Sequence, residues 1–352
     1  MPLQPNAARR ADASRIFVTG ASGFLGSLLV RELVARGQRV RCLVRSESAA
    51  TQLLGGLASL EQSANGIEFV FGSLSHEAVD REWLSGCDRV VHAAGALRGA
   101  PSTLVRQNVA ATRSLTEAAA ECSLERFVLV SSLSVYSPHG LEPEAILDES
   151  CPIERAPERR GPYVYSKVVQ ETVCRDICNG SLPLVIIRPG FIFGPGRGCL
   201  SDRVGPRVGR VLALVDADRS LPYTFVANCA SAVALAALAD SAAVDGEAFN
   251  IVDDELPTAR QIVDAYREGG GVLRVVRVPR WTITPLSRMY AWCHVRSDDL
   301  LPRSLLPYVI DALYKPLRFS NARAKTRLNW RPAVNLCSAL RLTINGTAAS
   351  VT

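Results

Sequence analysis

A glycine-rich turn between a strand and a helix, close to the amino terminus, restricts the possible folds of this chain more than any other feature. Residues 15–20 include an almost continuous apolar run, as in a strand that is buried on both faces of a sheet. Gly20, Gly23 and Gly26 follow at three-residue spacing, and a helical pattern over 28–36 ends at Gly37. Such a turn lets the backbone approach a pyrophosphate, with the helix N-terminus facing the anion. The order of these segments predicts a dinucleotide-binding fold, and a turn without a ligand is the alternative.

Apolar runs alternate with helical stretches over the first half of the chain. Further strands are predicted at 40–45, 67–71, 88–95, 126–132 and 184–189. This alternation predicts an α/β fold with a doubly wound parallel sheet, in which ligands bind beyond the carboxyl ends of the strands. The residues at those ends are mostly small, hydroxylated or turn-forming: Gly72, Ser73, Leu74, Ala93, Ala94, Gly95, Ser131, Ser132, Arg188, Pro189 and Gly190.

The end of the second predicted strand indicates which dinucleotide binds. An NAD-binding fold usually has a carboxylate there for the ribose 2′-hydroxyl, but this chain has Val44 followed by Arg45. Without the acid a 2′-phosphate is not repelled, and a guanidinium can bind the phosphate through two hydrogen bonds. We therefore expect NADP rather than NAD. The alternative is that Arg45 is only a solvated residue at a strand end.

Tyr163 and Lys167 stand four residues apart, on one face of a predicted helix. A neighbouring ammonium favours the phenolate, so this pair predicts a tyrosine with a lowered pKa that exchanges a proton with a substrate oxygen. Tyr165 is the competing phenol, but at two residues from Lys167 it would face away on a helix. A solvated helix face can carry the same spacing, and the glycine loop favours the catalytic interpretation.

The composition is that of a globular enzyme. With 352 residues, 48% of them hydrophobic, the chain can bury a large core in one dinucleotide fold and a smaller lobe. The ten cysteines show no metal spacing and the four histidines no ligand cluster, so we expect reduced packing cysteines, a cytoplasmic protein and no metal site. No stretch approaches the length of about eighteen apolar residues that predicts a transmembrane helix.

The net charge is +6, and arginines concentrate in 197–219 and 318–331. Two interpretations of the first segment stay open: a site for an anionic substrate, or a solvated flexible loop over the active site. Aromatic residues are not interleaved with the basic ones, so nucleic-acid binding is not expected. The aromatic stretch 281–292 is expected to line the substrate pocket or pack on the main domain, and contact with a membrane surface is the alternative.

The motifs in this order resemble those of the extended short-chain dehydrogenases/reductases, the NAD(P)-dependent epimerase/dehydratase family. The resemblance covers about residues 15–342, and it implies a small-molecule substrate and a homodimer. Its landmarks are 19–26, 92–94, 108–112, 131–136, Tyr163 with Lys167, 188–196, 249–252 and 328–332.

The resemblance also assigns roles to individual residues. Tyr163 would be the general acid/base, and Lys167 would lower its pKa and hold the nicotinamide ribose. Ser132 would supply the hydroxyl that binds the reacting oxygen, and Asn108 would brace the active-site helix. The implied cofactor-binding residues are Gly20, Ser22, Gly23, Phe24, Leu25, Gly26, Arg45, Ser73, Leu74, Ala93, Ala94, Gly95, Tyr163, Lys167, Pro189 and Gly190.

The chain departs from the family pattern at several positions. Ser73 stands where many members have an aspartate that contacts the adenine amino group. Leu133 and Ser134 replace the acids of sugar 4,6-dehydratases and nucleotide-sugar decarboxylases, and 220–228 lacks the arginine–aspartate pair common in nucleotide-sugar enzymes. These departures favour the 3β-hydroxysteroid dehydrogenase or dihydroflavonol reductase side of the family.

The predicted organisation is a disordered leader over 1–13, then a Rossmann domain over 14–195 that includes 224–252. A smaller, mostly helical substrate lobe would comprise 196–223 and 253–342, followed by a tail over 343–352. The predicted function is an NADP-dependent oxidoreductase that interconverts a secondary alcohol and a ketone. The alternatives are an epimerase that retains its cofactor, such as a nucleotide-sugar epimerase, and a dinucleotide sensor without catalysis.

Overall fold

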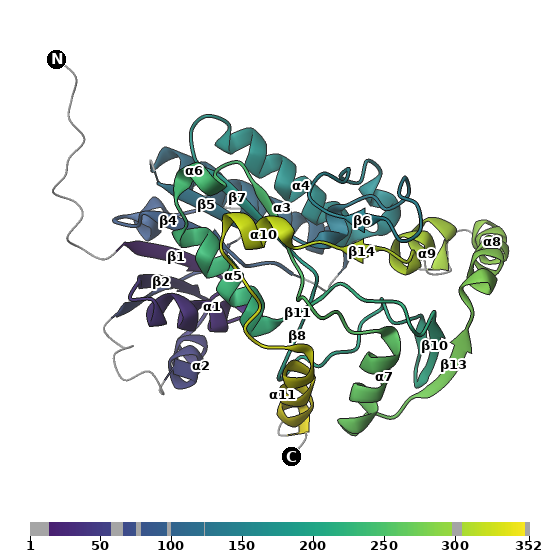
Figure 1. Cartoon of the computed structure of the whole chain (residues 1–352). Helices are drawn as coiled ribbons and strands as arrows, with labels where there is room; N and C mark the ends of the chain where they lie inside the picture. Colours follow the sequence, from purple (N-terminus) through teal and green to yellow (C-terminus); the bar gives the residue numbers. More distant parts are fainter. Residues whose placement is uncertain are drawn as a thin grey trace.

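The computed structural model describes residues 14–57, 66–74, 79–96, 100–122, 124–297 and 305–348. Its centre is a seven-stranded sheet in the order β12-β7-β5-β4-β1-β2-β3, with every neighbouring pair parallel (Figure 1). The predicted doubly wound Rossmann fold is therefore confirmed. The strands are β1 (Arg15–Thr19), β2 (Arg39–Val44), β3 (Ile67–Phe71), β4 (Arg89–His92), β5 (Arg126–Val130), β7 (Leu184–Pro189) and β12 (Ala248–Ile251).

Helices cover both faces of this sheet because successive strand side chains point to opposite faces. Ile16 and Val18 of β1 belong to one core cluster, which includes side chains of the helices α1 (Phe24–Ala35) and α5 (Val226–Leu238). Phe17 belongs to a second cluster, with side chains of α3 (Pro101–Glu121) and α4 (Pro162–Cys178). The remaining helices of this part are α2 (Glu47–Leu57), α6 (Ser241–Val244), and the short 3-10 turns η3 (Arg81–Leu84), η4 (Leu133–Val135) and η5 (Pro157–Arg160).

The smaller part of the molecule contains a second sheet, in the order β13-β10-β9, besides its helices. The arginine-rich segment 197–219 supplies two of these strands, so it is not an irregular loop throughout. Two short strand pairs, β8 with β11 and β6 with β14, lie between the two sheets (Figure 1). The elements are β6 (Ile146–Leu147), β8 (Phe191–Phe193), β9 (Arg207–Val208), β10 (Val211–Val215), β11 (Tyr223–Phe225), β13 (Arg274–Val278), β14 (Arg318–Phe319), α7 (Ala259–Glu268), α8 (Arg280–Arg296), α9 (Pro307–Tyr314), α10 (Ala322–Arg327) and α11 (Leu336–Ala348).

Two later elements of the chain belong to the large sheet again. Strand β12 pairs with β7, and helix α5 packs against α1. The carboxyl-terminal part is attached through Trp330, which is fully buried and donates from its indole nitrogen to the carbonyl of Asn228, 3.0 Å away. The domain boundaries given above stay a prediction. The predicted leader over 1–13 lies outside the described residues. Helix α11 extends through the first part of the predicted tail, and 349–352 lie outside the described residues.

The expectation that the aromatic stretch 281–292 lines a pocket or packs on the main domain is wrong for its two tryptophans. Helix α8 lies at the end of the molecule opposite β1 and β2 (Figure 1). Trp281 is 79% exposed and Trp292 is 59% exposed, because the buried side of the helix consists of Ile283, Ser287 and His294.

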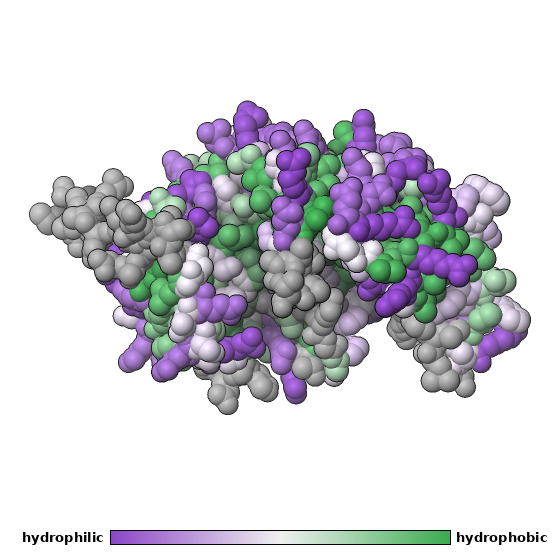
Figure 2. Space-filling view, turned by 90° about the horizontal axis from the view of Figure 1, so that it is seen from below, coloured by the Kyte–Doolittle hydropathy of each residue, from purple (hydrophilic) through white to green (hydrophobic). Residues whose placement is uncertain are grey.

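Seen from below, hydrophobic groups on the surface of the molecule are bordered by hydrophilic ones (Figure 2). Across the described ranges, every helix is too short or too polar to span a bilayer.

Candidate active site

The glycine loop after β1 has a shape that side chains would prevent. The amide of Gly23 donates to the carbonyl of Gly20 at 2.9 Å, and Gly20 has a φ of +70°. A Cβ atom on Gly20 would lie 2.8 Å from the backbone nitrogen of Ala94, and one on Gly26 would lie 1.9 Å from the Gly20 carbonyl oxygen. The loop therefore packs directly on the segment after β4, where the strand order reverses and dinucleotides bind in such sheets.

The surroundings of this loop fit a dinucleotide. Among the described residues, no side chain caps the N-terminus of α1 at Gly23, so its first N–H groups can bind an anion. Arg45 is exposed directly after β2, and within the described ranges no carboxylate pairs with it. Ser73 and Gly95 are exposed after β3 and β4. The other predicted contacts are less accessible: Phe24, Leu74, Ala93, Ala94 and Gly190 are partly buried, and Leu25, Gly26 and Pro189 are buried.

The structure brings Ser132 and Tyr163 together from two elements. Tyr163 lies in the first turn of α4, after Gly161 with its φ of +100°, and its phenol is near enough to the Ser132 hydroxyl for that hydroxyl to act on the pKa of the phenol. Ser132 follows β5, and its hydroxyl oxygen accepts from the Ser134 amide at 3.2 Å and the Ser134 hydroxyl at 2.9 Å. Because both lone pairs are then used, the O–H of Ser132 is left to donate.

Lys167 lies one helical turn after Tyr163 and is buried. Its ammonium donates to the carbonyl of Val130 at 2.9 Å, so it is held at the end of β5. Burial lowers the pKa of Lys167 to about 8, and the Glu171 carboxylate opposes this shift. The ammonium also lies close to Gly95, where an added Cβ would be 3.7 Å from it.

The expected lowering of the Tyr163 pKa by Lys167 does not occur in this structure. Burial raises the pKa of Tyr163, and the neighbouring Ser132 hydroxyl and the positive charges of Arg197 and Arg203 oppose the shift. Lys167 is directed at a backbone carbonyl instead. The phenol is therefore protonated at neutral pH, which is the form that donates a proton.

A buried acid, which the sequence analysis did not identify, organises the charges behind this site. Glu171 receives two hydrogen bonds from Arg188, at 2.9 and 2.6 Å, and one from the Ser131 hydroxyl at 2.6 Å. Arg188 also donates to the Tyr136 hydroxyl at 2.7 Å. The sequence offered a signal for Glu171, because this residue follows Lys167 by four positions and therefore lies on the same helix face.

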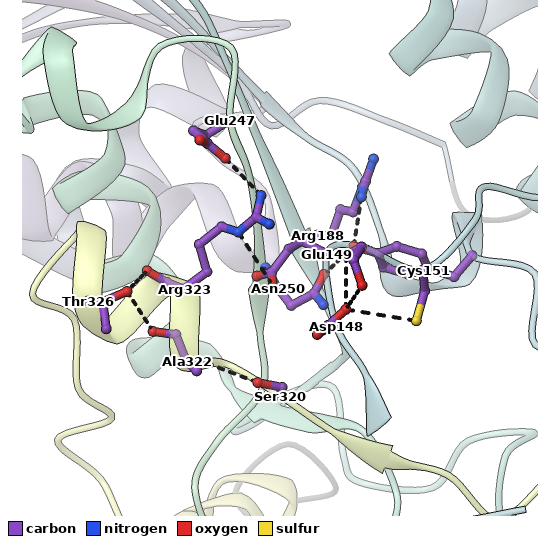
Figure 3. A network of polar contacts seen from close by, with 12 residues as sticks. Asp148, Glu149, Cys151, Arg188, Glu247, Asn250, Ser320, Ala322, Arg323 and Thr326 are labelled. Atoms are coloured by element: carbon purple, nitrogen blue, oxygen red, sulfur yellow. Dashed lines mark hydrogen bonds and ion pairs between the residues drawn. The ribbon is translucent and has the colours of Figure 1, made fainter. Parts of the chain in front are cut away.

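The network continues to the carboxyl-terminal part of the chain. The Tyr136 hydroxyl donates to the Asn250 side-chain oxygen at 2.8 Å, and the backbone N–H of Asn250 donates to the Glu149 carboxylate at 2.8 Å. Figure 3 shows Arg323 of α10 between Glu247, at 2.8 Å, and Glu149, at 3.8 Å. These contacts connect the end of the sheet with the segment that follows η4.

Asn108 joins two segments that border the site. Its side chain accepts from the Ala96 amide at 2.7 Å and donates to the Ala96 carbonyl at 3.0 Å and the Ser166 hydroxyl at 3.2 Å. Asn108 is buried in α3, so it connects the segment after β4 to the helix that carries Tyr163 and Lys167. This position matches the bracing role that the resemblance implies.

His92 is a buried structural residue beside the same helices. Its ring nitrogens contact the hydroxyls of Thr19, at 2.7 Å, and Thr112, at 3.0 Å. Burial, with a smaller contribution from Lys167, lowers the pKa of His92 to about 3, so the ring is neutral. Within the described ranges, no group of three or more histidine, cysteine or acidic side chains could hold a metal ion.

The chain matches the model of one protein family and is similar in sequence to several reductases. The model of the NAD dependent epimerase/dehydratase family matches residues 16–252. The 4-hydroxy-2-methyl-3-oxo-4-farnesyl-3,4-dihydroquinoline-1-oxide ketoreductase of Stigmatella aurantiaca is 31% identical, over 73% of this chain and 74% of that protein. The 2-alkyl-3-oxoalkanoate reductase of Stenotrophomonas maltophilia is 26% identical, over 93% and 97%.

The solved structures show the same fold. The UDP-glucuronic acid 4-epimerase of Bacillus cereus, solved in complex with NAD, superposes with a TM-score of 0.69. The match covers 96% of this chain and 100% of the epimerase at 20% sequence identity, so it supports the fold alone.

Proposed function

Because the chain belongs to the NAD dependent epimerase/dehydratase family, it is an NAD(P)-dependent oxidoreductase, and we propose that it interconverts a ketone and a secondary alcohol. The observation that carries the proposal is that the Ser132 hydroxyl and the Tyr163 phenol lie close together at the end of β5. With its pKa raised, the Tyr163 phenol keeps its proton at neutral pH and can supply it to an emerging alkoxide. The names of the two curated relatives, a ketoreductase and an oxoalkanoate reductase, support the same reaction.

Each residue of the site has a distinct task in this proposal. A bound nicotinamide supplies the hydride. Ser132 donates a hydrogen bond to the carbonyl oxygen, which accepts negative charge as the hydride arrives. Tyr163 then protonates that oxygen. Lys167 would hold the ribose of the nicotinamide. Asn108 holds the helix by its hydrogen bond to Ser166, and the negative charge of Glu171 favours the ammonium form of Lys167.

We propose NADP as the cofactor because of Arg45. Arg45→Asp is expected to weaken NADPH binding by roughly 10- to 100-fold, since a charge-assisted hydrogen bond to the 2′-phosphate is replaced by repulsion. NADH binding should be unchanged or tighter. Titrations followed by nicotinamide fluorescence measure both dissociation constants. Arg113→Asp, an exposed arginine on α3, is the control and should leave both constants unchanged. Equal dissociation constants of the unaltered protein for NADPH and NADH would contradict the assignment.

The proposed reaction is tested by mixing the purified protein with NADPH and a panel of ketones. Sterol, flavonoid, oxoacid and acyl ketones cover the main possibilities, and nicotinamide absorbance reports turnover. We expect oxidation of NADPH with at least one class. Binding of NADPH without turnover of any ketone would favour the dinucleotide sensor. That the protein forms a homodimer and lies in the cytoplasm remains a prediction. Gel filtration would test the dimer.

A further inference from the structure

Helix α8 presents to solvent a face that the proposed reaction does not use. The opposite side of the helix is anchored, because Ile283 belongs to a core cluster with Ile310 and Tyr314 of α9. Trp281 and Trp292 are exposed, and they stand eleven positions apart in the sequence. That spacing is about three helical turns, so the two indole rings lie in one line along the helix, opposite Ile283.

Further apolar side chains widen this line into a face. Leu286, Met289 and Val295 are each more than half exposed. Single apolar side chains on a surface are common, but a contiguous group of them marks a site of interaction. Together with two arginines, these side chains form the exposed face of α8: Trp281, Leu286, Arg288, Met289, Trp292, Val295 and Arg296.

The charge of this region has one sign. Residues 269–297 contain five arginines and no aspartate or glutamate. Arg288 and Arg296 are exposed on α8, and the Arg296 guanidinium lies 3.6 Å from the centre of the Trp292 ring. Two aspartates follow the helix, outside the described residues, and the sequence over 269–303 still holds six arginines against these two acids. The surface that covers this face is therefore expected to be anionic.

The surroundings of α8 extend the basic and apolar character of the face. Strand β13, which leads into the helix, exposes Arg274, Val276 and Arg277. Both elements lie at the end of the molecule away from β1, where the glycine loop begins (Figure 1). Contact of α8 with a flat surface would therefore leave the glycine loop in solution.

An anionic membrane surface supplies both groups that such a face needs. Tryptophan is enriched at the boundary between lipid head groups and acyl chains, because its ring is apolar and its N–H forms hydrogen bonds. Arginines beside the rings are attracted to negatively charged head groups. A helix with these side chains lies in the plane of the membrane surface. A second copy of the chain fits less well, because a two-fold symmetric contact would bring the arginines against one another.

We propose that the exposed face of α8 binds the surface of a membrane that contains anionic phospholipid. The helix lies parallel to the membrane, with its tryptophans among the head groups, and does not cross it. This inference does not rest on the proposed reaction, since none of the residues of the face is a proposed catalytic or cofactor-binding residue.

Vesicles of defined composition test the proposal. Protein that sediments with the vesicles is measured against lipid concentration, with phosphatidylcholine alone or mixed with phosphatidylglycerol. Binding to the anionic vesicles should be roughly tenfold tighter or more, and it should weaken as salt is added, because salt screens the arginines. Equal binding to both kinds of vesicle, or binding to neither, would overturn the proposal.

The double variant Trp281→Ser, Trp292→Ser removes the apolar anchors. Its binding to anionic vesicles should be weaker by about tenfold or more. The control replaces two exposed leucines on other helices, Leu54→Ser with Leu342→Ser, and should bind as the unaltered protein does. Because all four side chains are exposed, the melting temperatures should be nearly unchanged. Undiminished vesicle binding by the tryptophan variant would contradict the assignment of this face.

The double variant Arg288→Gln, Arg296→Gln tests the charge. Each basic side chain near an anionic membrane contributes about fivefold to binding, so we expect a loss of roughly 10- to 30-fold. Arg327→Gln with Arg341→Gln removes the same charge from exposed positions on α10 and α11 and should have little effect. Equal losses in the two variants would show that only net charge matters, which would also overturn the proposal.

Tryptophan fluorescence locates the contact. The emission of the unaltered protein should shift to shorter wavelength when anionic vesicles are added. Trp281→Phe with Trp292→Phe keeps apolar rings, so it should still sediment with the vesicles, but its emission should not shift. The remaining tryptophans are the partly buried Trp83 and the fully buried Trp330. A shift that persists in this variant would place the membrane contact elsewhere.

Gel filtration distinguishes a membrane contact from an interface between copies of the chain. We expect the Trp281→Ser, Trp292→Ser variant to elute with the unaltered protein. A smaller particle in this variant, combined with unchanged vesicle binding, would show that the face joins two protein chains and would overturn the proposal.

Discussion

Tyr163→Phe is expected to lower the turnover of ketone reduction by about 10²–10⁴-fold while NADPH binding is retained, because that is the usual contribution of general acid/base catalysis. The substitution removes only the phenolic oxygen, so the packing of the ring at the start of α4 is kept. Ser132 would still donate to the carbonyl oxygen, but no protein group at that position could protonate it. Steady-state rates and a fluorescence titration of NADPH measure the two effects separately.

Two companion variants define what the Tyr163 result means. Tyr165→Phe removes the other phenol of the same helix and should leave kcat nearly unchanged. Lys167→Met should reduce both kcat and NADPH affinity, since one ammonium is proposed to serve both. If Tyr165→Phe were inactive and Tyr163→Phe active, the assignment of the catalytic phenol would be wrong.

Glu171→Gln is expected to destabilise the protein by about 3–5 kcal/mol, the usual cost of removing one partner from a buried ion pair. Arg188 would keep its charge in the interior without a counter-charge, because both side chains of the pair are only 4% exposed. The variant keeps the shape of the side chain, so lost packing does not contribute. Urea unfolding, followed by far-ultraviolet circular dichroism, gives the change in the free energy of unfolding.

An exposed ion pair provides the control for that measurement. Asp218 pairs with Arg260 at 2.9 Å, but the two side chains are 78% and 42% exposed. Asp218→Asn should therefore change the free energy of unfolding by less than about 1 kcal/mol. Similar small losses for Glu171→Gln and Asp218→Asn would show that Glu171 is not essential to the buried network.

The sequence predicted the large sheet well because its central strands are buried on both faces. The predicted strands over 67–71 and 184–189 have the observed bounds, since each is a mostly apolar run that ends at a glycine or a proline. The first helix begins at Phe24, four residues before the predicted pattern, because its first turn belongs to the glycine loop. The small sheet was missed, since β9 has two exposed residues and no apolar alternation.

The candidate catalytic residues could be named from motifs, but their electrostatics could not be predicted. The spacing of Tyr163 and Lys167 does not reveal that burial dominates the pKa of the phenol or that the ammonium bonds to Val130. Glu171 and Arg188 form their pair across two elements, and Arg203 and Arg160 meet in one pocket from segments about 40 residues apart. Such contacts join residues that are distant in the sequence and meet only in the folded chain, so sequence patterns alone do not predict them.

The most direct test of the proposed chemistry follows the hydride itself. The protein is incubated with a reactive ketone and NADPH that carries deuterium at the transferable position, and the product alcohol is examined by mass spectrometry. Hydride transfer assisted by Ser132 and Tyr163 predicts one deuterium on the carbinol carbon and one NADPH oxidised for each alcohol formed. An alcohol without deuterium, or an epimerised product without net oxidation of NADPH, would contradict the proposed reduction.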